Sequence, residues 1–143
     1  MFNLFRKKSG LTLDEPALTL TKDAAQCRKA LQDAMIVPQE TEDGTLIFTG
    51  RAFGAPFAME IRIHIQGSKV TFVEFYRREE MDAQQSYAEM SAILRSFFGN
   101  TIFTSASVTK ALPSEQWYRP GMTVSHFLLE QKGPEEYLHI IIK

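Results

Sequence analysis

The chain has one cysteine, almost no net charge and no long run of apolar residues among its 143 positions. One cysteine excludes an intramolecular disulfide and any zinc or iron–sulfur site that needs several thiolates. No apolar run reaches the roughly 18 residues that a membrane-spanning helix requires. Sixteen Lys and Arg against seventeen Asp and Glu leave a formal charge of −1, which supplies no field to hold a polyanion. We therefore expect no nucleic-acid partner and no integral membrane segment.

The composition predicts a folded chain of one domain. Apolar residues make up 44% of the sequence and aromatic residues 11%, which is enough for a sizeable core. At a typical ~100–200 residues per domain, we expect a single domain over residues 15–143 and a flexible tail over residues 1–14.

The first residues lack the pattern of a secretory signal. Phe2, Leu4 and Phe5 come before the basic residues 6–8, whereas a secretory signal has its basic residues first and then an apolar run of roughly 7–15 residues. We therefore expect a cytoplasmic protein. An alternative interpretation of these residues is a weak tag for a membrane surface or a partner.

Hydrophobic periodicity predicts a helix and then an antiparallel meander. Apolar residues recur at alternating steps of three and four over residues 20–35, so we expect an amphipathic helix that Thr19 or Thr21 caps and Pro38 stops. The period then changes to two, and Gly67-Ser68 has the composition of a hairpin turn. The three expected strands are residues 45–50, 57–66 and 70–77.

A second helix and further strands complete the predicted order. Asp82 with Gln85 three residues later resembles a capping box, and Gly99 suits a left-handed stop, so we expect a helix over residues 82–98. Residues 101–109 are either a strand or a loop. The later expected strands are residues 116–119, 122–131 and 137–142.

The fold class that follows is α+β. We expect an antiparallel sheet of about five to six strands with two helices on one face, in the order helix, three strands, helix, two to four strands.

The three histidines all fall on expected strands. His64 shares a polar strand face with Glu60 and Arg62. His126 and His139 lie on the last hairpin. If Gln131 pairs with Glu136, both imidazoles lie on one face, and a shift of one residue in the register puts them on opposite faces.

Neither metal chemistry nor nucleophilic catalysis has a convincing residue set. Near the two hairpin histidines only Glu130 is a plausible third metal ligand, so we expect no metal and no cofactor. Cys27 lies in the apolar stripe of the first helix, which favours a core position over a reactive thiol. No Gly-x-Ser-x-Gly elbow is present, and we assign no catalytic residue.

Binding is the role that the remaining features favour. The polar sheet face with Glu60, Arg62 and His64 is one candidate surface, and the alternative is a solvated face with paired charges. Trp117-Tyr118 precedes a tight turn and is a second candidate, unless Trp117 closes the core. A third is the last strand, residues 138–142, which can pair with another chain if it is a sheet edge. The candidate binding residues are Glu60, Arg62, His64, Trp117, Tyr118, His126 and His139.

The order of elements resembles the layout of type III secretion chaperones, small cytoplasmic proteins that dimerise and hold a partner chain. The resemblance concerns element order alone, and it implies a binding role rather than catalysis. We therefore predict a small cytoplasmic, non-enzymatic module, chaperone-like or adaptor-like, with a protein partner or a second copy of itself. The alternative is a small-ligand-binding domain or a small enzyme that uses the polar sheet face.

Overall fold

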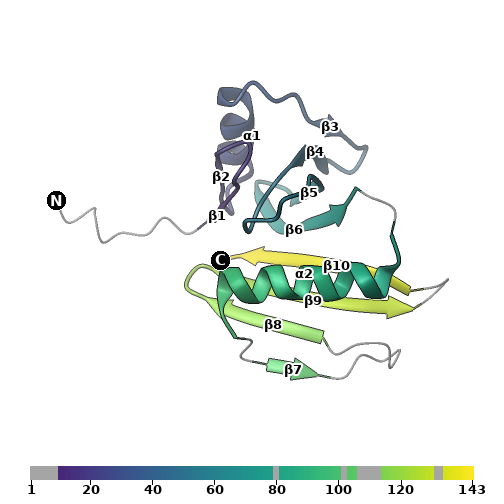
Figure 1. Ribbon diagram of the computed structural model, residues 1–143. Coiled ribbons are helices and arrows are strands. Elements are labelled where there is room, and N and C mark those ends of the chain that lie inside the picture. The colour runs from purple at the N-terminus through teal and green to yellow at the C-terminus, as the bar shows by residue number, and fades with distance from the viewer. Residues whose placement is uncertain (1–9, 79–80, 101–102, 106–113, 131–133) are drawn as a thin grey trace.

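The computed structural model describes residues 10–78, 81–100, 103–105, 114–130 and 134–143, and in these residues the chain alternates helices with antiparallel strands (Figure 1). The elements in chain order are β1 (Leu11–Thr12), β2 (Thr19–Leu20), α1 (Ala24–Asp33), β3 (Gln39–Glu40), β4 (Leu46–Gly50), β5 (Met59–Gln66), β6 (Lys69–Arg77), α2 (Ala83–Phe98), β7 (Phe103–Ser105), β8 (Ser114–Arg119), β9 (Met122–Glu130) and β10 (Pro134–Ile142). Strands β1 and β2 pair with each other, and the other eight form one antiparallel sheet in the order β3-β4-β5-β6-β10-β9-β8-β7. The predicted α+β class with an antiparallel sheet is confirmed.

The number of strands was underestimated. The main sheet has eight strands instead of five to six, and the two extra strands are its edges, β3 and β7. These edge strands span two and three residues, which is too short for a period-two pattern to be visible in a sequence. Strand β7 lies within the segment 101–109 that was predicted as either strand or loop, and most of the rest of that segment is outside the described residues.

The two helices begin at aspartates. The Asp82 carboxylate accepts the Gln85 backbone N–H at 3.0 Å, and α2 ends at Gly99 with φ 89°, as predicted. Helix α1 is shorter than the predicted 20–35, because Asp23 is its cap instead of Thr19 or Thr21. Residues 19–20 belong to strand β2. Within the described residues, neither helix is long and apolar enough to cross a membrane.

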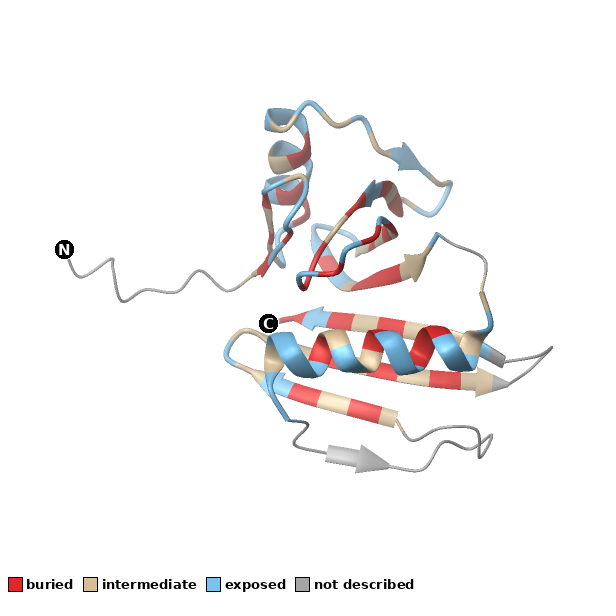
Figure 2. Cartoon of the chain, in the orientation of Figure 1, coloured by how far each residue is buried: buried red, intermediate tan, exposed pale blue. Residues whose placement is uncertain are grey.

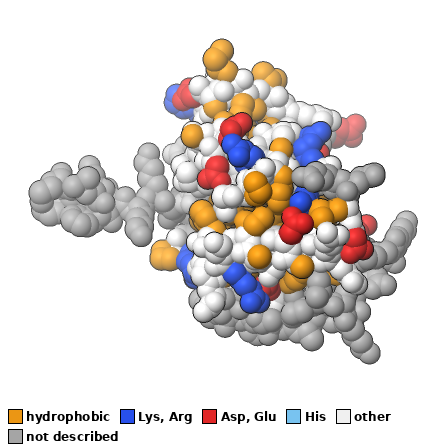
Figure 3. Space-filling model, in the orientation of Figure 1, with side chains coloured by type: hydrophobic (Ala, Val, Ile, Leu, Met, Phe, Trp, Pro, Cys, Tyr) orange, Lys and Arg blue, Asp and Glu red, His pale blue; other side chains and the backbone are white. Residues whose placement is uncertain are grey.

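Both helices pack on the same face of the sheet. Helix α1 contributes Cys27 and Leu31, and α2 contributes Met90 and Leu94, to one apolar core that also contains Ile61 and the alternate residues of the neighbouring strands. Figure 2 shows this alternation as buried and half-buried positions that follow each other along β9 and β10. Seen from the helix side, apolar side chains gather between the part that carries α1 and the part that carries α2 (Figure 3).

The last strand is an interior strand. Strand β10 lies between β6 and β9, and its residue Leu138 pairs with Phe75 of β6. Each half of the chain forms a helix followed by a meander, and the halves meet at this β6–β10 pair. The prediction that residues 138–142 offer an edge for another chain is therefore wrong, because β10 is paired with β9 along its whole length and with β6 at residues 138–140.

Residues before the predicted domain boundary at residue 15 belong to the core. Leu11 and Leu13 are buried in the core, although they precede residue 15. The segment after them crosses the end of β4, where the Arg51 N–H donates to the Glu15 carbonyl at 2.7 Å. Gly50 permits this crossing, since a Cβ atom there would lie 2.7 Å from the Glu15 carbonyl oxygen. Residues 1–9 of the predicted tail lie outside the described residues.

Candidate functional site

The face of the sheet that points away from both helices is the candidate site, and we call it the open face. No described helix or strand packs over it. Its side chains alternate with the core residues of the long strands. They include Glu60, Arg62 and His64 of β5, Phe72, Glu74 and Tyr76 of β6, Glu135, Tyr137, His139 and Ile141 of β10, Thr123, Ser125, Phe127 and Leu129 of β9, and Gln116 and Tyr118 of β8.

Glu74 is the centre of the open face. Its carboxylate accepts the Tyr76 hydroxyl at 2.7 Å and lies 2.7 Å from Nε2 of His139, and its other oxygen contacts Nε2 of His64. The side chain is only 9% exposed. Three side chains from β5, β6 and β10 are thus held together around one carboxylate.

The carboxylate of Glu74 is ionised because its neighbours favour the charged form. Burial alone raises the pKa of this group, but hydrogen bonds from Tyr76 and His64 and the charge of His139 outweigh it and hold the pKa of Glu74 below its ordinary value. Burial and the bond to Glu74 raise the pKa of Tyr76, which therefore stays a hydrogen-bond donor at neutral pH.

A short pattern recurs on three strands of the open face. In each case a tyrosine hydroxyl donates to the carboxylate or amide two residues earlier, on the same side of the strand. The pairs are Tyr76 with Glu74 at 2.7 Å, Tyr137 with Glu135 at 2.6 Å, and Tyr118 with Gln116 at 2.6 Å. A tyrosine ring whose hydroxyl is hydrogen-bonded to residue i−2 lies along its strand. Each of these tyrosines therefore presents a face of its ring at the surface of the sheet. The pattern Glu/Gln-x-Tyr is visible in the sequence, but its meaning depends on which face the tyrosines occupy.

Aromatic rings contact one another across the open face. The His64 ring stacks on Phe72 with centroids 4.2 Å apart, and Phe127 stacks on Tyr137 at 5.3 Å. His139 lies between these pairs, with its centroid 5.0 Å from that of Phe72. The open face is therefore a connected surface of half-buried rings instead of a set of separate solvated side chains.

The structure brings together the residues predicted for the polar strand. Arg62 Nε lies 2.6 Å from Glu60 Oε2, and the Arg62 guanidinium sits over the Tyr76 ring at 4.7 Å. His64 follows on the same side and contacts Glu74. Tyr118 lies on the same face and is 45% exposed.

Trp117 and His126 point the other way, into the core. Trp117 is fully buried and donates its indole N–H to the Gly99 carbonyl at 2.9 Å. In the last hairpin Pro134 pairs with Glu130, a register that puts His126 opposite Leu138 and His139 opposite Ser125. His126 and His139 therefore lie on opposite faces of the sheet, which settles the register that the sequence left open.

His126 belongs to a polar network beneath α2. Its Nε2 lies 2.6 Å from Glu136, its Nδ1 lies 3.4 Å from Glu115, and its ring stacks on Tyr87 of α2 at 4.1 Å. Helix α2 closes the network, because Arg95 lies 2.6 Å from Glu115 and Ser86 donates to Glu136 at 2.5 Å. These contacts fasten α2 to β8, β9 and β10.

The ionisation of this network is set by its own members. Burial lowers the pKa of His126, but hydrogen bonds to Glu115 and Glu136 more than offset that effect, so the pKa lies above its ordinary value. Burial likewise raises the pKa of Glu115, yet hydrogen bonds from His126, Ser91 and Arg95 hold it at about 2. The network therefore favours the protonated form of His126 and the ionised form of Glu115.

The other candidate groups have structural positions. Cys27 is fully buried, and this burial raises the pKa of its thiol above the ordinary value. No group of three or more His, Cys, Asp or Glu suited to a metal ion occurs within the described residues. The Glu130 side chain, the third ligand considered beside His126 and His139, is outside them.

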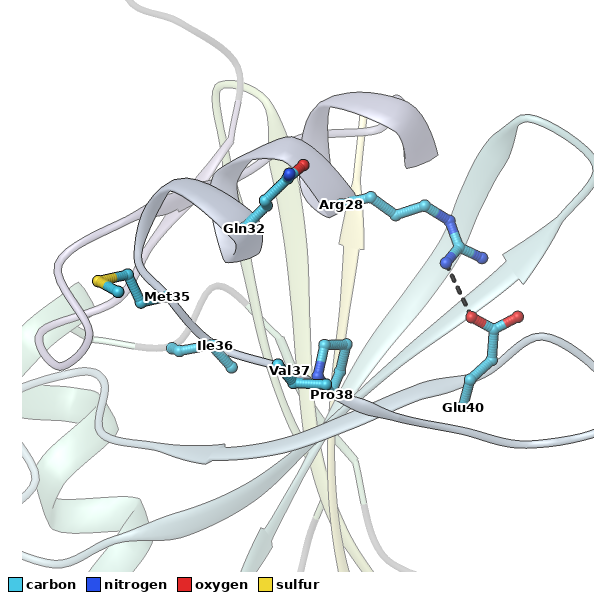
Figure 4. Close-up of a pocket in the computed structure, with 7 residues that line it drawn as sticks. All are labelled: Arg28, Gln32, Met35, Ile36, Val37, Pro38 and Glu40. Atoms are coloured by element: carbon cyan, nitrogen blue, oxygen red, sulfur yellow. Dashed lines mark hydrogen bonds and ion pairs between the residues drawn. The ribbon is translucent and has the colours of Figure 1, made fainter.

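Two hollows lie at the β3 end of the sheet. A hollow of about 340 Å³ borders the open face, where Arg62 and His64 line it beside the β3–β4 turn. A larger one of about 520 Å³ lies between α1 and β3 and includes Met35 and Val37, which are 91% and 95% exposed (Figure 4). Arg28 and Glu40 form an ion pair at 2.8 Å across its rim.

Comparison with protein-family models, with curated proteins and with solved structures finds no match for this chain.

Proposed function

We propose that the protein is a small cytoplasmic, non-enzymatic module, chaperone-like or adaptor-like, that receives a segment of a protein partner on its open face. The observation that carries this proposal is the ring surface itself. Phe72, Tyr76, Phe127 and Tyr137 lie on one face together with His64 and His139, and both helices pack on the opposite face.

Large aromatic rings are unusual on a sheet face that contacts only water. The outer face of an antiparallel sheet ordinarily carries polar side chains, and large aromatic residues are enriched where proteins meet. Ile141 adds an apolar side chain that is 49% exposed. Tyrosine suits this role because its ring buries apolar area while its hydroxyl keeps a hydrogen bond.

The polar groups of the open face support binding over catalysis. The Glu74 carboxylate interacts with Tyr76, His64 and His139 at once, and Arg62 is engaged with Glu60 and Tyr76. These contacts fix the rings in place before a partner arrives. A surface held in its binding geometry loses less conformational entropy on association.

Site-specific photo-crosslinking tests the proposal. p-Benzoylphenylalanine is placed at Tyr118 on the open face, and at Phe97 on α2 as the matched control, since both are exposed aromatic residues at 45% and 53%. In cells that naturally make the protein, we expect one reproducible crosslinked protein from position 118 and none from position 97. A second copy of this chain as the crosslinked protein indicates a homodimer. Crosslinks from position 97 alone contradict the proposal.

A small ligand is the second candidate, and the hollow beside the open face favours it. Its volume of about 340 Å³ is in the range of ligand pockets, and Arg62 and His64 provide polar groups at its wall. Soaking or titrating a panel of small carboxylates and phosphates, with NMR detection at Arg62 and His64, distinguishes this role from protein binding. Saturable shifts confined to the hollow favour it.

A further inference from the structure

We infer that the partner places an arginine side chain on the open face, over the Tyr137 ring and beside the Glu135 carboxylate. This inference rests on the proposed function, because it names the chemistry of the segment that the open face receives. It follows from two similar residue sets that lie side by side on β6 and β10.

The first set already holds a guanidinium from this chain. Tyr76 is tied to Glu74 through its hydroxyl at 2.7 Å, and Arg62 lies over the ring with Cζ 4.7 Å from the centroid. Glu60 holds the other side of Arg62 at 2.6 Å. A ring whose hydroxyl is bound to a carboxylate, with a further carboxylate at hand, is thus a site that accepts arginine in this protein.

The second set repeats the ring and its carboxylate, but Phe127 is paired with Tyr137 where Glu60 is paired with Tyr76. The guanidinium from the partner therefore has Glu135 as its carboxylate. Tyr137 donates its hydroxyl to Glu135 at 2.6 Å, and Phe127 stacks on Tyr137 at 5.3 Å to widen the aromatic surface. The Tyr76 and Tyr137 centroids are 6.5 Å apart, so both sets belong to one surface. The cation–π contacts found among the described residues are those of Arg62 with Tyr76 and of Arg77 with Phe57, and neither involves Tyr137.

Charge complementarity selects a cation for this position. The face of an aromatic ring is negative, and the Glu135 carboxylate is exposed next to it. The same charge acts within the chain, because the hydrogen bond to Glu135 raises the pKa of the Tyr137 hydroxyl. An arginine guanidinium can stack on the ring and donate to the carboxylate at once, whereas lysine offers a point charge. An exposed contact of this kind strengthens binding by about 2- to 5-fold, and more where water is excluded.

The experiment compares two peptides that differ only in charge. The probes are an eight-residue peptide of alternating valine and arginine, and the same peptide with citrulline, which has nearly the shape of arginine without its charge. Affinity is measured by calorimetry and the binding position by NMR shifts of the ¹⁵N-labelled chain. We expect the arginine peptide to bind about 2- to 5-fold more tightly, with shifts centred on Tyr137 and Phe127.

Two variants show whether the preference comes from this set. Glu135→Gln should remove most of the difference between the peptides. Asp33→Asn on α1, an exposed carboxylate far from the open face, removes the same charge and should leave the difference unchanged.

The failures of the two proposals are distinguishable. Equal binding of both peptides on the open face overturns the arginine inference and leaves the binding function standing. A preference that Asp33→Asn reduces as much as Glu135→Gln also overturns it, since net charge then explains the result. If neither peptide perturbs the open face, the arginine inference is overturned, and the crosslinking result alone decides the proposed function.

Discussion

His139 Nε2 lies 2.7 Å from Glu74 Oε2, although 65 positions separate the two residues in the chain. The contact crosses the β6–β10 pair, which joins the first meander to the second. It makes Glu74 a shared acceptor for both halves of the sheet, and it fixes the geometry of the open face at its centre.

Replacing this shared acceptor should weaken the fold. Glu74→Gln keeps the size of the side chain but brings an amide N–H₂ toward Tyr76, His64 and His139. We expect the free energy of unfolding, measured by urea denaturation, to fall by about 2 kcal/mol because three half-buried donors lose a charged acceptor. Glu135→Gln, at an exposed carboxylate of the same face, should change it by less than about 0.5 kcal/mol. Equal effects of the two substitutions contradict the central role of Glu74.

The network beneath α2 should make stability depend on pH in both directions. The pKa of His126 is raised in the folded state. Its contribution to stability is therefore complete below the pKa of the unfolded chain, near 6.5, and is lost as pH rises through the folded-state pKa. The pKa of Glu115 is lowered to about 2, so its contribution is complete above about 4.5 and is lost as pH falls toward 2. We expect maximal stability between about pH 4.5 and 6.5.

Urea denaturation across pH 2–9 measures this profile, and one variant assigns its alkaline side. His126→Gln keeps a polar side chain of similar length but does not titrate. The unfolding free energy of this variant should therefore decline less above pH 6.5 than that of the wild type. A decline of the same size in the variant and the wild type shows that another group is responsible.

The single tryptophan should report on the contact between α2 and β8. Trp117 is fully buried, so its emission should be blue-shifted relative to free tryptophan and resistant to acrylamide quenching until the chain unfolds. Trp117→Phe removes the hydrogen bond to Gly99 and leaves a smaller ring, which should cost about 2 kcal/mol of unfolding free energy. Strong quenching of the native protein contradicts the buried position.

The single cysteine should be unreactive in the folded protein. Cys27 is fully buried and the pKa of its thiol is raised, so little thiolate is available to a reagent such as Ellman's. We expect reaction at the rate of unfolding, and fast reaction of one additional thiol in a Val37→Cys variant, whose position is 95% exposed. Fast labelling of the wild-type chain would contradict the buried position of Cys27.

Hydrophobic periodicity predicted the long helices and strands well because their apolar pattern repeats several times. Helix α2 and the hairpin of β5 and β6 each repeat their pattern several times, and each ends at a residue with a clear local preference, such as Gly67 or Gly99. The edge strand β3 was missed, and residues 101–109, which contain β7, were left as either strand or loop, because both strands span too few residues for any period to show.

The candidate site was only partly predictable, since it depends on pairings between distant strands. Sequence spacing put Glu60, Arg62 and His64 on one side of a strand, and they lie there. The central position of Glu74 needed the pairing of β6 with β10, which no local pattern encodes. The faces of His126 and His139 depended on a register that a single residue in the turn reverses.

The central claim is that the open face binds a protein partner, and the affinity of the crosslinked partner for two matched variants tests it most directly. Ile141→Lys puts a charge at a 49% exposed position of the open face, and Ala92→Lys puts one on the outer side of α2. Calorimetry should show a Kd raised at least tenfold for Ile141→Lys and unchanged for Ala92→Lys, with both variants as stable as the wild type. An unchanged Kd for Ile141→Lys, or a loss confined to Ala92→Lys, contradicts the claim.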